Sequence, residues 1–360
     1  MMVDPSDSPD RGAFPNRILI IRLSAIGDVV FSSPLVDALK EAHQEADIFW
    51  LAESPVVPLL EHHPHLRDVI VWPRAEWREL FSSGRWLALL REVLRFKKRL
   101  RHYQFDLVID AQGLFKSAVL AWMTGAARRV GFASKEPTRG LLTERITKDA
   151  GPAISSEYRA MAQYLGCESD VFPMKVCVPP SVGIWADAFR GEAPYVAICP
   201  FTTRPQKHWP EVHWQALVRR LLAQGWRVVV LGGPTDSVSA DRIFTDVPVE
   251  SMVGKAALLE SAALVGRADL VIGVDTGLTH MGWAFGVPTI ALFGSTCPYR
   301  DLGGLRGAVL YKNMTCSPCR RKPVCGGTYD CLADLYPDRV LESMAGLLRD
   351  KSAFHSVVAS

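Results

Sequence analysis

Apolar residues in the first half of the chain fall into short runs that alternate with longer helical patterns. Residues 17–23, RILIIRL, form such a run, as expected for a strand that is buried on both faces. Similar runs predict strands at 46–52, 68–72 and 105–112, and helical patterns lie at about 28–43 and 85–103. Strand–helix alternation of this kind predicts right-handed βαβ units and a parallel sheet.

The same alternation begins again after a proline-rich seam at 176–183, VCVPPSVG. Strands are predicted at 195–200, 226–233, 270–275 and 289–294, helices at about 211–224, 236–245 and 256–267, and a last helix at about 337–349. We therefore expect an α/β protein with two doubly wound parallel sheets that face each other across a cleft. Ligands bind such sheets at the carboxyl ends of the strands.

This pattern also divides the chain. We expect a disordered lead-in, an N-terminal Rossmann-like domain, a C-terminal Rossmann-like domain, and a final helix with a tail, at residues 1–16, 17–178, 184–335 and 336–360. The two large domains account for the two sheets. The proline-rich seam between them is expected to act as a hinge.

Composition excludes several classes of protein. The 360 residues carry 41 Lys and Arg against 38 Asp and Glu, and a formal charge of +3 does not favour nucleic-acid binding. No apolar stretch is long enough to span a membrane, and the polar, acidic N-terminus does not resemble a secretory signal. We expect a cytoplasmic protein whose eight cysteines are reduced.

An acidic residue follows the first predicted strand. Asp28 comes after Gly27 in the segment RLSAIGDVV and falls in the first turn of the next helix. Acids are common there because the helix dipole favours negative charge, so Asp28 has an ordinary structural explanation. A carboxylate facing a cleft can also take a proton from an acceptor hydroxyl.

Three segments at strand ends of the second half suit a nucleotide diphosphate. Residues 201–210, FTTRPQKHWP, place two hydroxyls and two cations in one loop, although a solvated basic loop is the simpler alternative. Residues 275–280, DTGLTH, enter a helix whose first backbone N–H groups form an anion site. The turn 232–236, GGPTD, adds an acid for a ribose hydroxyl. Neither half has the G-x-G-x-x-G fingerprint, which disfavours a dehydrogenase.

Four segments, taken in order, resemble one known family. RLSAIGDVV, DLVIDAQGLFKSA, TTRPQKHWPEVHW and DLVIGVDTGLTH are similar to the ADP-heptose:lipopolysaccharide heptosyltransferases of glycosyltransferase family 9. The likeness runs from about residue 17 to residue 304, and K-H-W-P is most similar to the heptosyltransferase I branch. The resemblance implies the GT-B fold and an inverting, metal-independent transfer of heptose from ADP-heptose to a Kdo hydroxyl of the lipopolysaccharide inner core.

The resemblance also implies roles for individual residues. Asp28 matches the general base that activates the Kdo hydroxyl, with Gly27 beside it on the acceptor side. Lys207 matches the lysine that neutralises the leaving diphosphate. Donor-binding roles are implied for Thr202, Thr203, Asp236, Asp275, Thr276, Gly277, Leu278 and His280. We expect closure of the two halves to assemble this site.

Basic residues of the first half are expected to bind the acidic acceptor, Kdo-lipid A. They are expected on loops: Arg74, Arg78, Lys116, Lys135 and Arg139. Residues 74–103 hold nine Lys or Arg against three Glu, interleaved with aromatic and leucine residues. A basic amphipathic helix of this kind can lie on an anionic membrane surface or bury its apolar face in the core. The resemblance favours a peripheral protein on the cytoplasmic face of the inner membrane.

Four cysteines fall in one short segment with the spacing C-x2-C-x5-C-x5-C: Cys316, Cys319, Cys325 and Cys331. Four thiolates suit a structural zinc or iron ion, although unligated thiols in a loop are equally compatible. No cofactor is expected for catalysis. Similar clusters occur in family branches that glycosylate autotransporter proteins, so the first core heptose and a protein hydroxyl stay open as acceptors. A catalytically inactive nucleotide-sugar-binding protein and a GT-B epimerase are the remaining alternatives.

Overall fold

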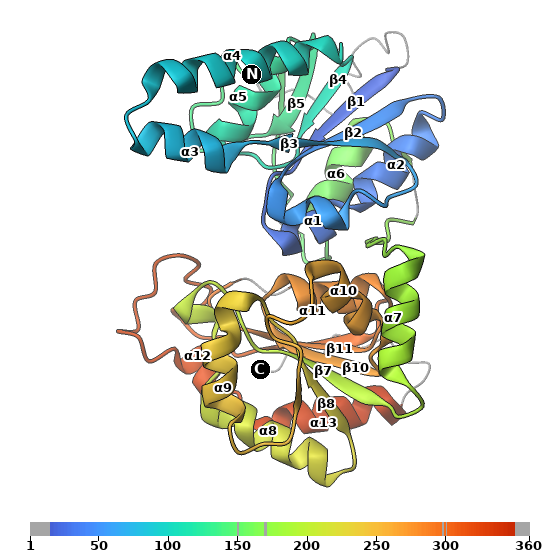
Figure 1. Ribbon diagram of the computed structural model, residues 1–360, viewed down its shortest axis with the longest axis vertical. Coiled ribbons are helices and arrows are strands. Elements are labelled where there is room, and N and C mark those ends of the chain that lie inside the picture. Colours follow the sequence, from blue (N-terminus) through green and yellow to red (C-terminus); the bar gives the residue numbers. More distant parts are fainter. Residues whose placement is uncertain (1–14, 150, 169–170, 297–298, 300, 350–360) are drawn as a thin grey trace.

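Two parallel sheets form the framework of the protein, one in each half of the chain (Figure 1). The computed structural model describes residues 15–149, 151–168, 171–296, 299 and 301–349. Residues 1–14 of the expected lead-in and 350–360 of the expected tail lie outside these described residues. No helix among the described residues is both long enough and apolar enough to cross a bilayer.

The first sheet has six strands in the order β3-β2-β1-β4-β5-β6. Its strands are β1 (Arg17–Ile21), β2 (Asp47–Glu53), β3 (Leu66–Trp72), β4 (Leu107–Asp110), β5 (Arg128–Phe132) and β6 (Glu144–Ile146). Its helical segments are α1 (Ile26–Ser32), α2 (Pro34–Ala42), η1 (Ser54–Leu59), α3 (Arg74–Ser82), α4 (Trp86–His102), α5 (Phe115–Thr124) and α6 (Ser156–Tyr164).

The second sheet also has six strands, in the order β12-β11-β10-β7-β8-β9. Its strands are β7 (Tyr195–Cys199), β8 (Arg227–Val230), β9 (Glu250–Ser251), β10 (Leu270–Val274), β11 (Thr289–Phe293) and β12 (Gly307–Tyr311). Its helical segments are α7 (Pro180–Arg190), η2 (Pro205–Lys207), α8 (Glu211–Ala223), η3 (Pro234–Asp236), α9 (Ser237–Phe244), α10 (Leu258–Arg267), α11 (Gly277–Ala284), α12 (Asp330–Ala333) and α13 (Pro337–Arg349).

The two sheets share one topology. Counted within its own half, each sheet runs 3-2-1-4-5-6, and every strand pair is parallel. The direction of winding therefore reverses between β1 and β4 in the first sheet and between β7 and β10 in the second. Ligands of doubly wound sheets bind at such reversal points, beyond the carboxyl ends of the strands. The expected α/β fold with two Rossmann-like sheets is confirmed.

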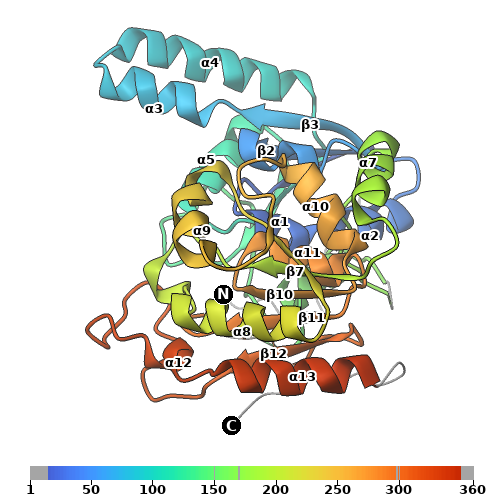
Figure 2. The same cartoon turned by 60° about the horizontal axis from the view of Figure 1, so that its bottom comes forward.

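Burial explains the apolar runs that predicted the strands. Ile18, Leu19, Ile20 and Ile21 of β1 are fully buried, because helices cover both faces of a parallel sheet. In the second half, the last helix, α13, packs on α8 and β12 (Figure 2). Its buried residues Val340, Met344 and Leu347 make it part of that half.

Two predicted elements differ from the structure. The helical pattern at 28–43 is two helices, because Pro34 has no N–H to continue the hydrogen-bond ladder and instead begins α2. The proline-rich seam is extended only in its first part, since Pro180 begins α7 and that helix packs on α10. A proline in the first turn of a helix costs no hydrogen bond, which makes this start ordinary.

Candidate active site

The candidate residues of both halves lie at the two reversal points. Asp28 follows β1, Lys207 follows β7, and Asp275 follows β10 directly. The helices α1 and α11, which follow β1 and β10, lie at the junction between the halves (Figure 1). The fold thus brings together residues that are almost 250 positions apart in the sequence.

Two helix N-termini touch across this junction. A Cβ at Gly27 of α1 would lie 2.7 Å from Cδ2 of His280 on α11, and a Cβ at Gly277 would overlap the side chain of Ile26. Phe31 of α1 packs on the His280 ring with a centroid separation of 4.5 Å. Glycine is required at both positions because the helices approach too closely for a side chain.

On the first half, Asp28 is held by a buried arginine. Arg22, whose side chain is 7% exposed, forms an ion pair with Oδ2 of Asp28 and donates a hydrogen bond to the carbonyl of Ala111 at 2.9 Å. The backbone N–H of Ala25 donates to the same carboxylate oxygen at 3.3 Å. Asp28 itself is 48% exposed, so its carboxylate is held by Arg22 on the buried side and is reachable from solvent on the other.

On the second half, Asp275 is the centre of a compact polar cluster. Lys207 forms an ion pair with it, Nε2 of His280 lies 3.0 Å from Oδ1, and the Thr296 hydroxyl donates to Oδ2 at 2.7 Å. Burial alone would raise the pKa of Asp275, but His280 and Lys207 outweigh it and hold that pKa well below its usual range. The cluster stands at the N-terminus of α11, where exposed N–H groups favour an anion.

The remaining donor-side residues surround this cluster. Thr276 is the N-cap of α11, and Gly277 and Leu278 form its first turn. Thr202 and Thr203 lie in the loop after β7, partly buried and exposed respectively. Asp236 lies after β8 and accepts a hydrogen bond from the Gly233 N–H at 2.9 Å, so it also closes its own turn.

Three of the five expected acceptor cations lie on helices and not on loops. Arg74 and Arg78 belong to α3 and Lys116 to α5, because the chain re-enters a helix within a few residues of each strand end. Lys135 and Arg139 are exposed between β5 and β6, in the loop where they were expected.

Glu53 is a site residue that the sequence analysis missed. Its carboxylate lies 2.9 Å from Nη1 of Arg74 and 3.3 Å from Nζ of Lys116, and its side chain is only 14% exposed. Glu53 ends β2, so an acid at the carboxyl end of a predicted strand was the signal that could have found it. It neutralises part of the basic surface expected to bind the acceptor.

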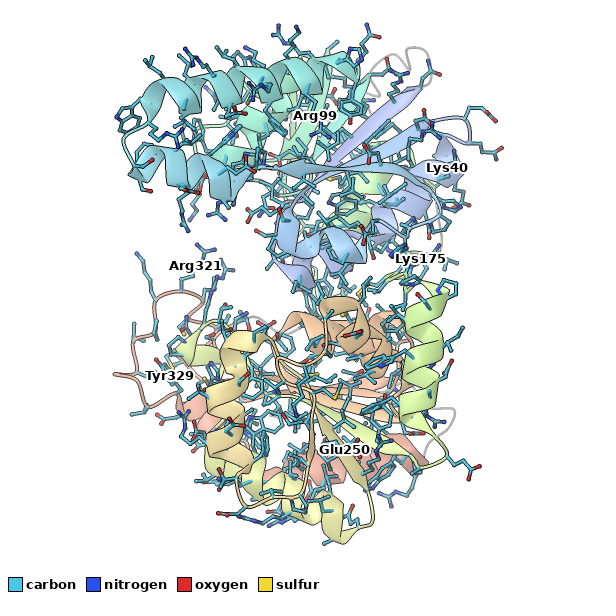
Figure 3. The ribbon with its side chains drawn as sticks, viewed as in Figure 1. Lys40, Arg99, Lys175, Glu250, Arg321 and Tyr329 are labelled. Carbon is cyan, nitrogen blue, oxygen red and sulfur yellow. The ribbon has the colours of Figure 1, made fainter. Side chains whose placement is uncertain are left out.

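The four clustered cysteines line one small cavity beside the donor loop. Three of them lie in the loop 312–329, and Cys331 lies in α12. This loop is tied to the donor loop by a hydrogen bond from Nε2 of Gln206 to the Arg320 carbonyl at 3.1 Å, and Figure 3 shows its Arg321 on the side nearer the first half. Burial, followed by the other three cysteines, raises the pKa of Cys331 to about 11. In the part of the chain that the structure describes, no three of these sulfurs lie within 4.8 Å of one another.

The other cysteines lie apart from this loop. Cys167 and Cys199 are buried, and Cys177 is partly buried in the segment that joins the halves. Cys297 lies outside the described residues. Burial raises the pKa of the Cys199 thiol well above its usual value, which suits an inert core thiol.

Comparisons with known proteins agree with this arrangement. The model of glycosyltransferase family 9 (heptosyltransferase) matches residues 93–328, well over half of the chain. The chain belongs to glycosyltransferase family 9. Lipopolysaccharide heptosyltransferase 1 of Pseudomonas aeruginosa is 30% identical over 320 residues, which cover 85% of this chain and 86% of that protein.

Solved structures share the fold of this family 9 protein. A glycosyl transferase family 9 protein from Veillonella parvula has a TM-score of 0.77 at 21% identity and covers 93% of this chain and 98% of its own. The E. coli heptosyltransferase WaaC with ADP-2-deoxy-2-fluoro heptose has a TM-score of 0.70 at 24% identity, with coverage of 91% and 99%. The expected GT-B fold and glycosyltransferase class are confirmed.

Proposed function

We propose that this enzyme transfers heptose from ADP-heptose to a Kdo hydroxyl of the lipopolysaccharide inner core, with inversion and without a metal in the chemical step. The observation that carries the proposal is the contact between α1 and α11, which sets Asp28 of one half opposite the Lys207–Asp275 pair of the other. The identity to lipopolysaccharide heptosyltransferase 1 of P. aeruginosa supports the choice of sugar and pathway.

The donor half suits a nucleotide diphosphate. The N–H groups at the start of α11 and the ammonium of Lys207 provide positive charge where the diphosphate accumulates negative charge as it leaves. Lys207 would exchange its carboxylate partner for a phosphate oxygen. Asp275, still bonded to His280 and Thr296, would then orient heptose hydroxyls, while Thr202, Thr203 and Asp236 complete the donor pocket.

Asp28 supplies the base. Its carboxylate accepts the proton of the Kdo hydroxyl as that oxygen attacks the anomeric carbon from the face opposite the diphosphate. Arg22 and the Ala25 N–H bind Oδ2, so they fix the direction of the carboxylate. Closure of the two halves around both substrates would bring base and sugar into line.

A basic helical hairpin would face the acceptor and the membrane. The helices α3 and α4 stand away from the rest of the protein in Figure 2 and carry exposed apolar residues among their cations: Phe81, Trp86, Leu87, Leu90 and Leu94. Apolar groups between cations suit an anionic bilayer surface. The enzyme would thus act from the cytoplasmic face of the inner membrane on Kdo-lipid A, with Arg78, Lys135 and Arg139 near its acidic groups.

The cysteine loop would serve the donor side structurally. A zinc or iron ion bound by Cys316, Cys319, Cys325 and Cys331 would hold the loop that contacts Gln206. Metal binding would require the sulfurs to draw together and lose their protons. This role is separate from catalysis.

The decisive experiment is a transfer assay with ADP-heptose and a delipidated Kdo acceptor, in the presence of EDTA. Wild-type protein should form the heptosylated product with inverted anomeric configuration, and Asp28→Asn should reduce kcat by about 10²–10⁴ with little change in donor affinity. Asp338→Asn, a carboxylate far from the site on α13, is the matched control.

The same assay would also identify a different acceptor. Product formed only with heptosylated core would move the acceptor to the first heptose, and product formed only with a serine-rich protein would indicate protein glycosylation. Donor binding without transfer to any acceptor would favour an inactive nucleotide-sugar-binding protein. Conversion of ADP-heptose in the absence of an acceptor would indicate an epimerase.

A further inference from the structure

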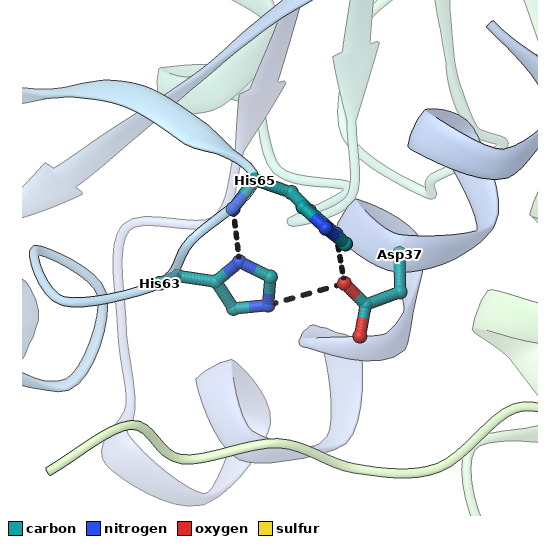
Figure 4. A group of neighbouring side chains, drawn as sticks. All are labelled: Asp37, His63 and His65. Atoms are coloured by element: carbon teal, nitrogen blue, oxygen red, sulfur yellow. Dashed lines mark hydrogen bonds and ion pairs between the residues drawn. The ribbon is translucent and has the colours of Figure 1, made fainter. Parts of the chain in front are cut away.

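A second polar cluster lies in the first half, away from the candidate active site. Asp37 of α2 meets His63 and His65, which lie in the turn between η1 and β3 with one residue between them (Figure 4). The two histidines precede β3, so the cluster lies near the amino end of that strand, whereas the candidate active site follows the carboxyl ends. The reaction proposed above does not use it.

The three side chains direct one ligand atom each toward a common point. Nδ1 of His65 lies 2.6 Å from Oδ1 of Asp37, Nε2 of His63 lies 3.6 Å from the same oxygen, and all three atoms fall within 4.8 Å of one another. Ligands of a tetrahedral zinc ion stand about 3.4 Å apart, given metal–ligand distances of ~2.0–2.1 Å. Small side-chain rotations would therefore admit an ion.

His63 adds an independent indication of a missing ligand. Its side chain is 2% exposed, and its Nε2 has no hydrogen-bond partner among the described residues. At 3.6 Å, Asp37 is too distant to satisfy that nitrogen. An orphaned, buried imidazole beside a carboxylate is consistent with an absent cation.

We propose that Asp37, His63 and His65 form a binding site for a divalent transition-metal ion of the zinc class. Two imidazoles and one carboxylate are ligands that zinc accepts, and the exposure of His65 leaves the fourth position to water. When Nε2 of His63 binds the ion, its Nδ1 carries the proton, so the long 3.3 Å hydrogen bond from the His65 N–H is given up.

Lys175 opposes the ion and links the site to the segment between the halves. Its Nζ lies 3.0 Å from Oδ2 of Asp37, the carboxylate oxygen that the histidines do not contact. Figure 3 shows Lys175 at the junction of the two halves. Its positive charge competes with a cation, and because it is 35% exposed it can turn into solvent when the ion binds.

The test is zinc titration of the full-length protein, stripped with EDTA, in a Cys316→Ala/Cys319→Ala background that disables the other thiol-rich candidate site. One equivalent of zinc is expected to bind, and His65→Gln or Asp37→Asn should weaken that binding at least tenfold. Lys175→Met should tighten it. His62→Gln is the matched control, since His62 is an exposed neighbour that pairs with Glu61 instead.

Cobalt gives a second readout. Co²⁺ at this site should show weak visible bands without thiolate-to-metal charge transfer, and the bands should disappear in His65→Gln. His65 is 42% exposed, so its replacement is not expected to prevent folding, which circular dichroism verifies. Absence of a zinc equivalent, or an equal loss of binding in His62→Gln, would overturn the proposal.

Discussion

Gly27 and His280 are in contact across the junction of the two halves, with 2.7 Å between the position of a Cβ at residue 27 and Cδ2 of the histidine. The ring cannot retreat easily, because it is packed against Phe31 and Trp283 and bound to Asp275. The approach of the two halves at the candidate active site is therefore limited at a point where a single added methyl group would clash.

Gly27→Ala should force α1 and α11 apart. We expect a loss of about 1–3 kcal/mol in the free energy of unfolding, as for other overpacked sites, and a drop in kcat. Thermal denaturation and transfer kinetics measure both. Gly346→Ala in α13 is the control, because its Cβ would meet no atom within 4 Å and alanine favours a helix. Wild-type kcat in Gly27→Ala would contradict the tight junction.

Lys207→Met should impair donor use. Loss of the ammonium removes charge stabilisation of the departing diphosphate, so kcat should fall by about 10² and ADP affinity should also decrease. Lys40→Met is the control, since Lys40 lies on α2 in the first half and donates a hydrogen bond to the Ala46 carbonyl at 3.1 Å. Calorimetry measures the affinity for ADP, and single-turnover kinetics measures the rate of transfer. Unchanged ADP affinity together with unchanged kcat would show that Lys207 serves only Asp275.

Arg78→Gln and Arg139→Gln should weaken acceptor binding. Both side chains are exposed, and a charge-assisted contact to a carboxylate or phosphate is worth about 1.5–3 kcal/mol, so the acceptor KM should rise about tenfold or more. The donor KM should not change. Steady-state kinetics with each substrate varied in turn separate the two, and Arg339→Gln on α13 is the control. A rise in the donor KM alone would show that these arginines bind the donor and not the acceptor.

The α3–α4 hairpin should bind anionic vesicles through its exposed leucines. Leu87→Glu combined with Leu94→Glu should reduce the fraction that floats with phosphatidylglycerol vesicles, while neutral vesicles bind little protein in either case. Val238→Glu is matched to Leu87, since both side chains are 75% exposed. Equal flotation of the leucine variant and the control would exclude this surface.

Asp110 should make stability depend on pH. Burial raises its pKa to about 6, against the partial compensation of hydrogen bonds from Ser117, Gly113 and Gln112. A raised pKa in the folded state means stability that is complete below about pH 4 and lost as the pH rises through about 6, by at most about 3 kcal/mol. Asp110→Asn keeps the accepting oxygen and should flatten the curve over this window. Urea unfolding between pH 4 and 8 measures the free energy of unfolding at each pH. If that free energy falls as steeply with pH in Asp110→Asn as in the wild type, the prediction is wrong.

Much of the fold follows from pattern. Buried central strands such as β1 and β10 are nearly pure apolar runs, so periodicity finds them and their ends locate Asp28 and Asp275. Four strands were not anticipated: β5, β6, β9 and β12. The apolar run of β12 was missed although it is fully buried. The edge strands β6 and β9 have three and two residues and mix polar with apolar positions. Strands this short are stabilised by their neighbours rather than by their own sequence.

The pairings within the site were beyond prediction. Lys207 and Asp275 come from different strand ends, and Glu53 meets Lys116 across 63 positions of sequence. Residue type and spacing show which groups reach the edge of a sheet, but only the strand order brings particular partners together. The same holds for Asp37 and His65, whose proximity depends on how α2 packs beside the turn that precedes β3.

The repeated 3-2-1-4-5-6 order gives each sheet its own complete set of strand ends, and α1 of one half touches α11 of the other. If the proposed function holds, preference for the incoming alcohol and preference for the activated sugar reside in separate modules. Under the proposed function, a recombinant enzyme with the first module of one relative and the second of another would have to match every contact between the halves, including the glycine-containing starts of α1 and α11, the packing of η1 on α10, and the bridge between Ala153 and Asp301.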